Sequence, residues 1–96
     1  MKVDLQELLI KANSGDVQAQ CDLGKLYAEG EVVEQDYQAA LHWFTVASEN
    51  GSSMAKACLG VMYESGNGVE ADIGKAIECY QLAVYDNDPT GMYNLA

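Results

Sequence analysis

The side chains that most often carry catalysis are scarce in this chain. His42 is the single histidine among 96 residues, and it stands beside Trp43 with no catalytic motif around it. A general base needs a reacting group within hydrogen-bond reach, so a surface or partly packed helix position explains His42 better. The sequence also lacks G-x-S-x-G, H-E-x-x-H and P-loop signatures. We therefore expect a non-enzymatic protein with no cofactor, and a hydrolase of unknown type is a remote alternative.

The three cysteines offer little support for a metal or disulfide framework. Their number is odd, they lie far apart in sequence, and none of them forms a C-x-x-C pair; they are Cys21, Cys58 and Cys79. Zinc sites usually present such pairs, so we expect small, mostly buried apolar side chains instead. A bridge between Cys58 and Cys79 is the alternative, because the two residues fall on neighbouring helices of the pattern described below.

The sequence at residues 86–91 resembles the first six positions of a calcium-binding loop; it reads D-N-D-P-T-G. Oxygen-bearing side chains stand at its positions 1, 3 and 5, and Gly91 stands at position 6. The twelfth position, which normally supplies a bidentate Glu, would be residue 97, outside this sequence. Gly91 also corresponds, in the repeat described below, to positions where helices begin. We therefore expect no metal site.

The charge of the chain limits its partners. Five Lys, no Arg and fifteen Asp and Glu give 5 − 15 = −10. Such a chain repels phosphates and anionic lipids, so we expect no nucleic acid, no membrane and a protein partner with a basic or neutral segment. The N-terminus shows no secretory pattern and no run of 18 apolar residues occurs. This predicts a cytoplasmic protein, with a periplasmic or secreted one as the alternative if a signal peptide has been removed.

The chain repeats itself with a period of 36 residues. When residues 19–54 are aligned with residues 55–90, ten of the thirty-six positions are identical without a gap. A period of this length is typical of solenoids, in which helix hairpins stack on their neighbours. The sequence thus predicts one domain over 1–96, with a half-repeat helix at 1–18, two full repeats, and the truncated start of a third at 91–96.

Each unit shows the signals of two helices. Asp16 and Asp36 are suitable N-caps, and Gly30 is a suitable C-cap. A helix-interior Gly costs about 1 kcal/mol relative to Ala, so Gly24 and Gly60 indicate that a facing helix packs against the bare backbone. No segment alternates like a strand, and the fold class is all-α. The expected helices are 4–13, 16–29, 36–49, 52–65, 72–85 and 88–96.

The repeated motif carries a family resemblance. The strings A-x-x-x-L-G-x-L-Y-x-x-G at residues 19–30 and V-x-x-D-x-x-x-A-x-x-W-F-x-x-A at residues 33–47 resemble the Sel-one-like repeat (SLR) family. The second copy, residues 55–83, is more similar still. The ordinary tetratricopeptide repeat is the runner-up, but its period is 34. The resemblance implies a right-handed α-solenoid of antiparallel helix pairs that acts as an adaptor for protein complexes. Some members carry one disulfide per repeat, and the corresponding positions here are Ser48 and Lys56.

The resemblance also implies where a partner would bind. In the family, the first helix of each unit lines the concave side, and its exposed residues contact partners. Met54, Cys58 and Val61 would form an apolar strip suited to a peptide or a helix. For Ala57 and Val61, packing against the adjacent repeat is an equal alternative. The expected partner-binding residues are Gln18, Cys21, Asp22, Lys25, Glu29, Met54, Ala57, Cys58, Val61, Ser65, Tyr93 and Asn94.

A second functional class is homotypic assembly. Solenoids need polar terminal helices to stay soluble, and the sequence closes on residues 92–96, a first helix without its partner. Tyr93 and Leu95 would therefore lack half of their cover. Either a second molecule supplies that cover, as a homo-dimer through the C-terminal edge, or the chain is a fragment of a longer array.

Overall fold

The computed structural model describes residues 4–87, and this part of the chain is built from α-helices without a strand. The all-α prediction is confirmed. Five of the expected helices are present, each starting one residue later than expected because the capping residue lies outside the helix. The sixth, expected over 88–96, lies outside the described residues. The helices are α1 (Leu5–Asn13), α2 (Val17–Glu29), α3 (Tyr37–Glu49), α4 (Ser53–Ser65) and α5 (Ile73–Asn87).

Side-chain caps fix where the helices begin. The Asp16 carboxylate accepts the backbone N–H of Ala19 at 3.1 Å, and Asp36 accepts that of Ala39 at the same distance. Each such bond satisfies one of the four N–H groups that a helix leaves unpaired at its start. At the other end of α2, Gly30 adopts a left-handed conformation with φ 72° and closes the helix. The predicted capping residues are thus confirmed.

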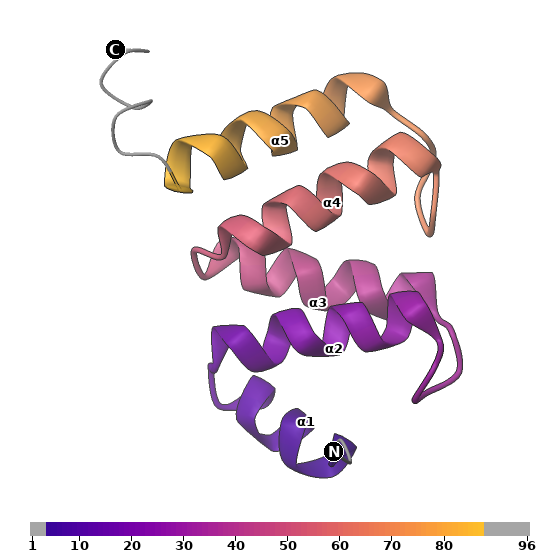
Figure 1. Cartoon of the computed structure of the whole chain (residues 1–96), viewed down its shortest axis with the longest axis vertical. Coiled ribbons are helices and arrows are strands. Elements are labelled where there is room, and N and C mark those ends of the chain that lie inside the picture. Colours follow the sequence, from indigo (N-terminus) through magenta and orange to yellow (C-terminus); the bar gives the residue numbers. More distant parts are fainter. Residues whose placement is uncertain (1–3, 88–96) are drawn as a thin grey trace.

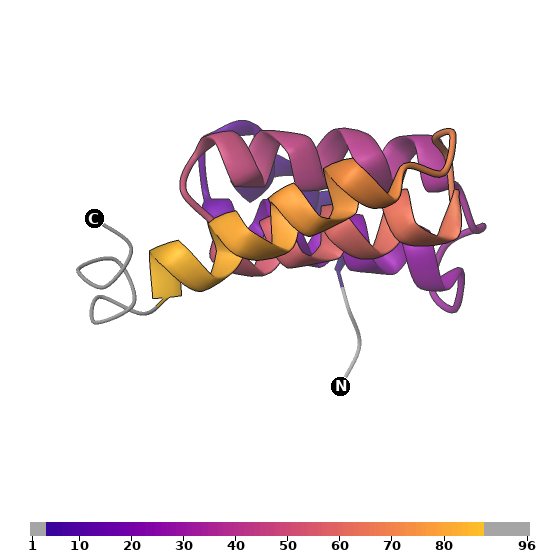
Figure 2. The same ribbon diagram turned by 90° about the horizontal axis from the view of Figure 1, so that it is seen from above.

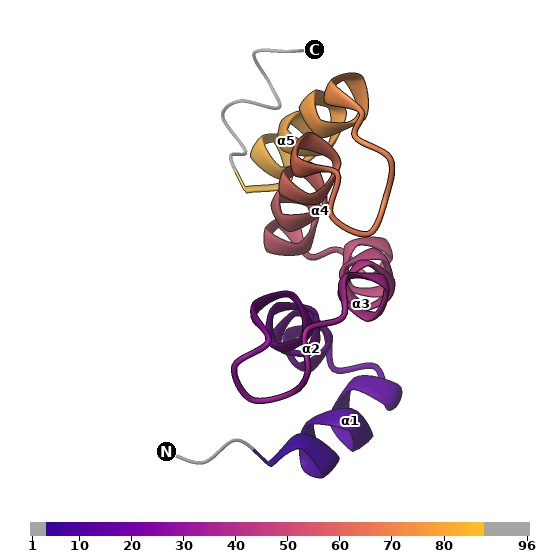
Figure 3. The same cartoon turned by 90° about the vertical axis from the view of Figure 1, so that its right-hand side faces the viewer.

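The helices stack in chain order as antiparallel neighbours. Figure 1 shows the chain reversing direction at each turn, and the extensive helix–helix contacts are all between consecutive helices. Viewed from the side, α2 and α4 lie on one side of the stack and α1 and α3 on the other (Figure 3). From above, α5 runs obliquely to α3, so the second repeat is rotated relative to the first (Figure 2). The fold is an α-solenoid of helix pairs.

Two hydrophobic clusters hold this stack together. The larger one joins α2, α3 and α4 around Phe44, whose side chain is buried between them. The smaller one joins α1 to α2 through Ala12, Ala19 and Leu23. Because each cluster involves only successive helices, stability accumulates along the stack rather than in one central core.

Candidate functional site

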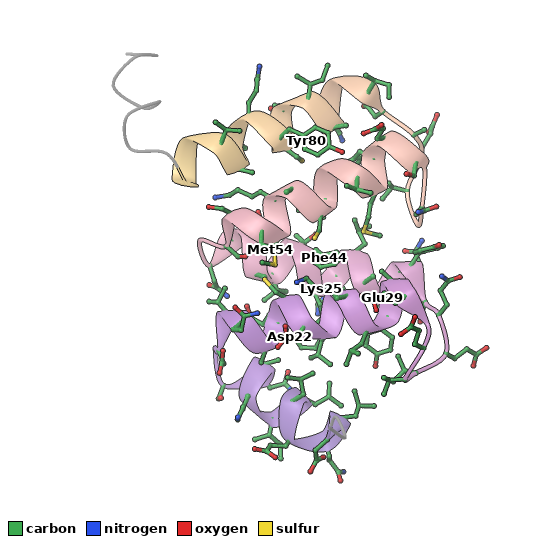
Figure 4. The ribbon with its side chains drawn as sticks, viewed as in Figure 1. Asp22, Lys25, Glu29, Phe44, Met54 and Tyr80 are labelled. Carbon is green, nitrogen blue, oxygen red and sulfur yellow. The ribbon has the colours of Figure 1, made fainter. Side chains whose placement is uncertain are left out.

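Eight of the twelve predicted partner-binding residues lie in two stripes, one on α2 and one on α4. On α2 the stripe follows positions 18, 22, 25 and 29, and on α4 it follows 54, 58, 61 and 65. Spacings of four, three and four keep residues on one face of a helix. Figure 4 shows Asp22, Lys25 and Glu29 in a row along α2, Phe44 between α2 and α4, and Met54 near the start of α4. The two stripes therefore border the same space.

An open cavity of about 250 Å³ lies between the two helices. Four of the predicted residues, Lys25, Glu29, Cys58 and Val61, contribute to its wall. Two buried side chains of the larger cluster, Phe44 and Met62, also line it, together with Tyr37. We call this space, with those seven residues, the α2–α4 groove. Its surface is mainly apolar, with one cationic and one anionic side chain at the rim.

The exposure of these side chains determines what a partner can reach. Met54 is 48% exposed and Val61 is 51% exposed, so both side chains present apolar surface to solvent. About half of the Val61 side chain is open to a partner, whereas Ala57 is half-buried. Asp22 is held in place because its carboxylate accepts a hydrogen bond from Gln18 Nε2 at 3.0 Å. The exposed predicted residues are Gln18, Glu29, Met54, Val61 and Ser65.

Cys21 is buried, as expected for the cysteines, and it therefore does not face a partner as its place among the predicted binding residues requires. Its side chain is 2% exposed and belongs to the larger hydrophobic cluster, with Sγ 2.9 Å from the Oγ of Ser52 at the start of α4. Cys21 precedes Asp22, so it lies about 100° further round α2 and faces the neighbouring repeat instead of the groove. The remaining predicted residues, Tyr93 and Asn94, lie outside the described residues.

The groove cysteine behaves as an apolar side chain. Burial raises the pKa of the Cys58 thiol, and the nearby Lys25 ammonium only partly opposes this effect. The thiol therefore keeps its proton at neutral pH and presents no charge to a ligand. All three cysteines are free thiols in this structure, so the alternative of a Cys58–Cys79 bridge is not realised.

Part of the groove was missed at the sequence level. Asn67, from the loop between α4 and α5, also borders the cavity. That loop contacts the first repeat: Gln38 Nε2 on α3 donates a hydrogen bond of 2.6 Å to the carbonyl of Gly68. A Cβ at Gly68 would fall 2.9 Å from Cβ of Tyr37, and its φ of 75° is left-handed, so glycine is needed there. The loop contains the sequence G-N-G-V at residues 66–69, and nothing in that local pattern indicates its contact with the preceding repeat.

Neither a metal site nor a membrane span is found in the part of the chain that the structure describes. Over residues 4–87, no group of three or more His, Cys, Asp and Glu side chains could hold a metal ion. No helix in that range is long and apolar enough to cross a bilayer. The groove is the feature at which the predicted residues of α2 and α4 meet.

Comparisons with known proteins agree with this architecture. The Sel1 repeat profile matches residues 17–52 and 53–88, in a frame two residues earlier than 19–54 and 55–90. A Sel1 repeat protein from Oxalobacter formigenes is 34% identical with a TM-score of 0.82, covering 88% of this chain and 34% of that chain. A protective antigen of uropathogenic Escherichia coli strains displaying an SLR fold is 36% identical with a TM-score of 0.85.

The second comparison covers 98% of this chain and 20% of the antigen's chain, so the sequence spans about a third and a fifth of these two solved structures. A search of curated proteins found no match. Sel1 repeats generally act as non-catalytic protein-interaction modules. The two consecutive matches cover most of the sequence, and the chain belongs to the Sel1 repeat family.

Proposed function

We propose that this chain is an adaptor that binds a segment of a partner protein in the α2–α4 groove. The observation that supports this is the open apolar cavity between the first helices of two consecutive repeats. At about 250 Å³ it is smaller than the ~300–1,000 Å³ typical of small-molecule and cofactor sites. Its size and openness suit one or two apolar side chains that project from a peptide or helix.

The chemistry of the rim defines the partner. Met54 and Val61 offer exposed apolar contacts, the kind of surface that an anchoring side chain of a partner buries. Asp22 and Glu29 stand beside Lys25 at the edge, and the chain as a whole carries −10. Electrostatic attraction therefore favours an amphipathic segment with basic or neutral residues and repels acidic ones.

Affinity capture with a matched pair of variants tests this proposal. Val61→Asp places a charge in the groove, whereas Ile10→Asp places the same charge on α1, at a residue that is 67% exposed. Both variants exchange an exposed aliphatic residue for Asp, so they share any general effect of the substitution. We expect mass spectrometry to identify a partner retained by wild type and Ile10→Asp and lost by Val61→Asp. Equal retention by both variants would contradict binding in the groove.

A second candidate is homotypic assembly through α5. Ile73, Ile77 and Val84 lie on one face of this helix and are 57%, 50% and 58% exposed. In the first repeat the positions equivalent to Ile73 and Ile77 are Tyr37 and Leu41, which pack against the larger cluster. The apolar row Ile73, Ile77 and Val84 is exposed on α5, whereas the equivalent Tyr37 and Leu41 are covered in the first repeat, and such an exposed row offers a surface to a second copy.

Light scattering over a concentration series tests the homotypic candidate. Self-association through this row predicts a mass that rises with concentration in wild type and in Ile10→Glu, but not in Ile77→Glu. Ile10 is the matched control because it is the same residue type and is also exposed, at 67% against 50% for Ile77, but lies on α1. A wild-type mass that stays monomeric at high concentration would exclude the candidate.

A further inference from the structure

Each repeat contains a pocket where its first helix meets the loop that leads to its second helix. In the first repeat, Tyr27, Glu34, Gln35 and Asp36 line an open cavity of about 390 Å³. We call it the first loop pocket. It is separate from the groove, because Tyr27 is two residues from Lys25 on α2 and therefore points about 200° away from it.

The second repeat has a cavity of about 430 Å³ at the equivalent place, the second loop pocket. Tyr63, Glu70 and Asp72 line it, and each stands 36 residues after its counterpart. The backbone geometry is also the same. Asp36 N–H donates to the Tyr27 carbonyl at 2.9 Å, and Asp72 N–H donates to the Tyr63 carbonyl at 2.8 Å. The two pockets are thus copies of one local structure.

The copies differ in two respects. The first loop pocket is lined by Gln35, whose Nε2 donates to the Ala28 carbonyl at 2.8 Å, where the second is lined by Ala71. The other difference bears directly on the binding of a cation. In the second loop pocket, the Lys75 ammonium lies over the Tyr63 ring, 5.5 Å from the ring centroid. This distance is within the range of cation–π attraction. The equivalent position in the first repeat is Ala39, so that pocket has the tyrosine and the carboxylates without the ammonium group.

The side chains at positions 39 and 75 start from equivalent places in the backbone, at the beginning of the second helix of each repeat. The N–H of Ala39 donates to Asp36 Oδ1 at 3.1 Å, and the N–H of Lys75 donates to Asp72 Oδ1 at 3.0 Å. A helix N-terminus by itself disfavours a cation, but the capping carboxylate offsets this effect. The placement of Lys75 shows that an ammonium group fits this environment.

We propose that the first loop pocket binds the ammonium group of a lysine side chain from a partner protein. The Tyr27 ring would receive the cation as Tyr63 receives Lys75, and Glu34 and Asp36 would supply the opposite charge. Both carboxylates belong to exposed residues, so an approaching side chain can reach them. This site does not depend on the groove, and each can fail without the other.

Exchange of residues between the two repeats tests the proposal. The probe is Nα-acetyl-lysine N-methylamide, and its control is the norleucine derivative, which lacks the ammonium group. In ¹H–¹⁵N NMR titrations of wild type, we expect saturable shifts of the Glu34 and Asp36 amide signals with the lysine probe only. Ala39→Lys should fill the pocket from within and weaken probe binding by about fivefold or more. Lys75→Ala should create a second site, with new shifts at Glu70 and Asp72.

Two outcomes would overturn the inference. One is equal shifts with the norleucine derivative, which would show that the cation is not recognised. The other is undiminished binding by a folded Ala39→Lys variant. If Ala39→Lys does not fold, Lys75→Ala decides alone, and the absence of new shifts at Glu70 and Asp72 counts against the pocket.

Discussion

The ring of Phe44 lies directly against the backbone of Gly24, where α3 crosses α2. A Cβ built on Gly24 would fall 2.5 Å from Cε1 of Phe44, closer than carbon atoms can approach. The second repeat reproduces this relationship, since a Cβ on Gly60 would fall 2.7 Å from Cε1 of Tyr80. The glycine of the L-G pair thus sets the distance between the two helices of a repeat, which accounts for its presence in a helix interior.

Gly24→Ala should therefore destabilise the fold. Overpacking costs about 1–3 kcal/mol, and the gain of about 1 kcal/mol in helix propensity does not compensate for a buried ring that cannot move. We expect a net loss of up to about 2 kcal/mol in the free energy of unfolding, measured by urea denaturation. Gly60→Ala should cost less, because Tyr80 is only half-buried and can shift.

Gly74→Ala is the matched control for these two variants. A Cβ at this exposed position of α5 would meet only Asp72 Oδ1, at 3.3 Å. Its free energy of unfolding should stay within about 1 kcal/mol of the wild-type value. A Gly24→Ala protein as stable as Gly74→Ala would show that the ring contact does not limit the helix spacing.

Gln20 provides a second test, because it is a buried polar side chain that connects three segments. Its Nε2 donates to the Ala12 carbonyl at 3.0 Å, and its Oε1 accepts from Asn50 Nδ2 at 3.2 Å. Gln20→Met keeps the shape but removes both bonds, and should lower the free energy of unfolding by about 1–3 kcal/mol. Asn50→Ala, at an exposed residue, should cost less. If the two variants lost equal stability in urea, the Ala12 bond would contribute nothing.

The pH dependence of stability tests the contact between Tyr80 and Glu64. The Tyr80 hydroxyl donates to Glu64 Oε1 at 2.8 Å, and this bond is the main cause that raises the pKa of Tyr80 above its ordinary value of 10.0. The folded chain then keeps this proton at a pH where the unfolded chain has lost it. The contribution to stability is complete below that ordinary pKa and is lost as the pH rises through the folded pKa.

Burial also raises the pKa values of the Cys58 and Cys79 thiols above their ordinary value of 9.0. The alkaline decline in stability should therefore begin at a lower pH than Tyr80 alone would give. Urea titrations between pH ~8 and ~11 should show a smaller alkaline loss for Tyr80→Phe than for wild type. Identical pH profiles for the two proteins would mean that the hydroxyl bond does not contribute in solution.

The sequence predicts the helices better than it predicts the groove. Asp16 and Asp36 act within three residues, so local chemistry is enough to place the starts of α2 and α3. The end of α5 was predicted two residues too early: the helix continues to Asn87, because no glycine directly follows residue 85 to close it. The burial of Cys21 depends on its contact with Ser52, which lies 31 positions later in the sequence. Only the stacking of the repeats determines where Ser52 lies. The same holds for the contribution of Asn67 to the groove.

Charge reversal separates local recognition in the groove from the general effect of an acidic chain. The double variant Asp22→Lys/Glu29→Lys changes the groove rim, whereas Glu31→Lys/Glu49→Lys changes a loop and the end of α3. Both have the same net charge, −10 + 4 = −6. Exposed ion pairs contribute about 0.2–1 kcal/mol each, so the rim variant should bind a basic captured partner about 2- to 30-fold more weakly than the control. Isothermal titration at two salt concentrations measures this, and the difference should shrink at high salt. If both variants lost affinity equally, only the overall charge would attract the partner, and the rim would have no specific role.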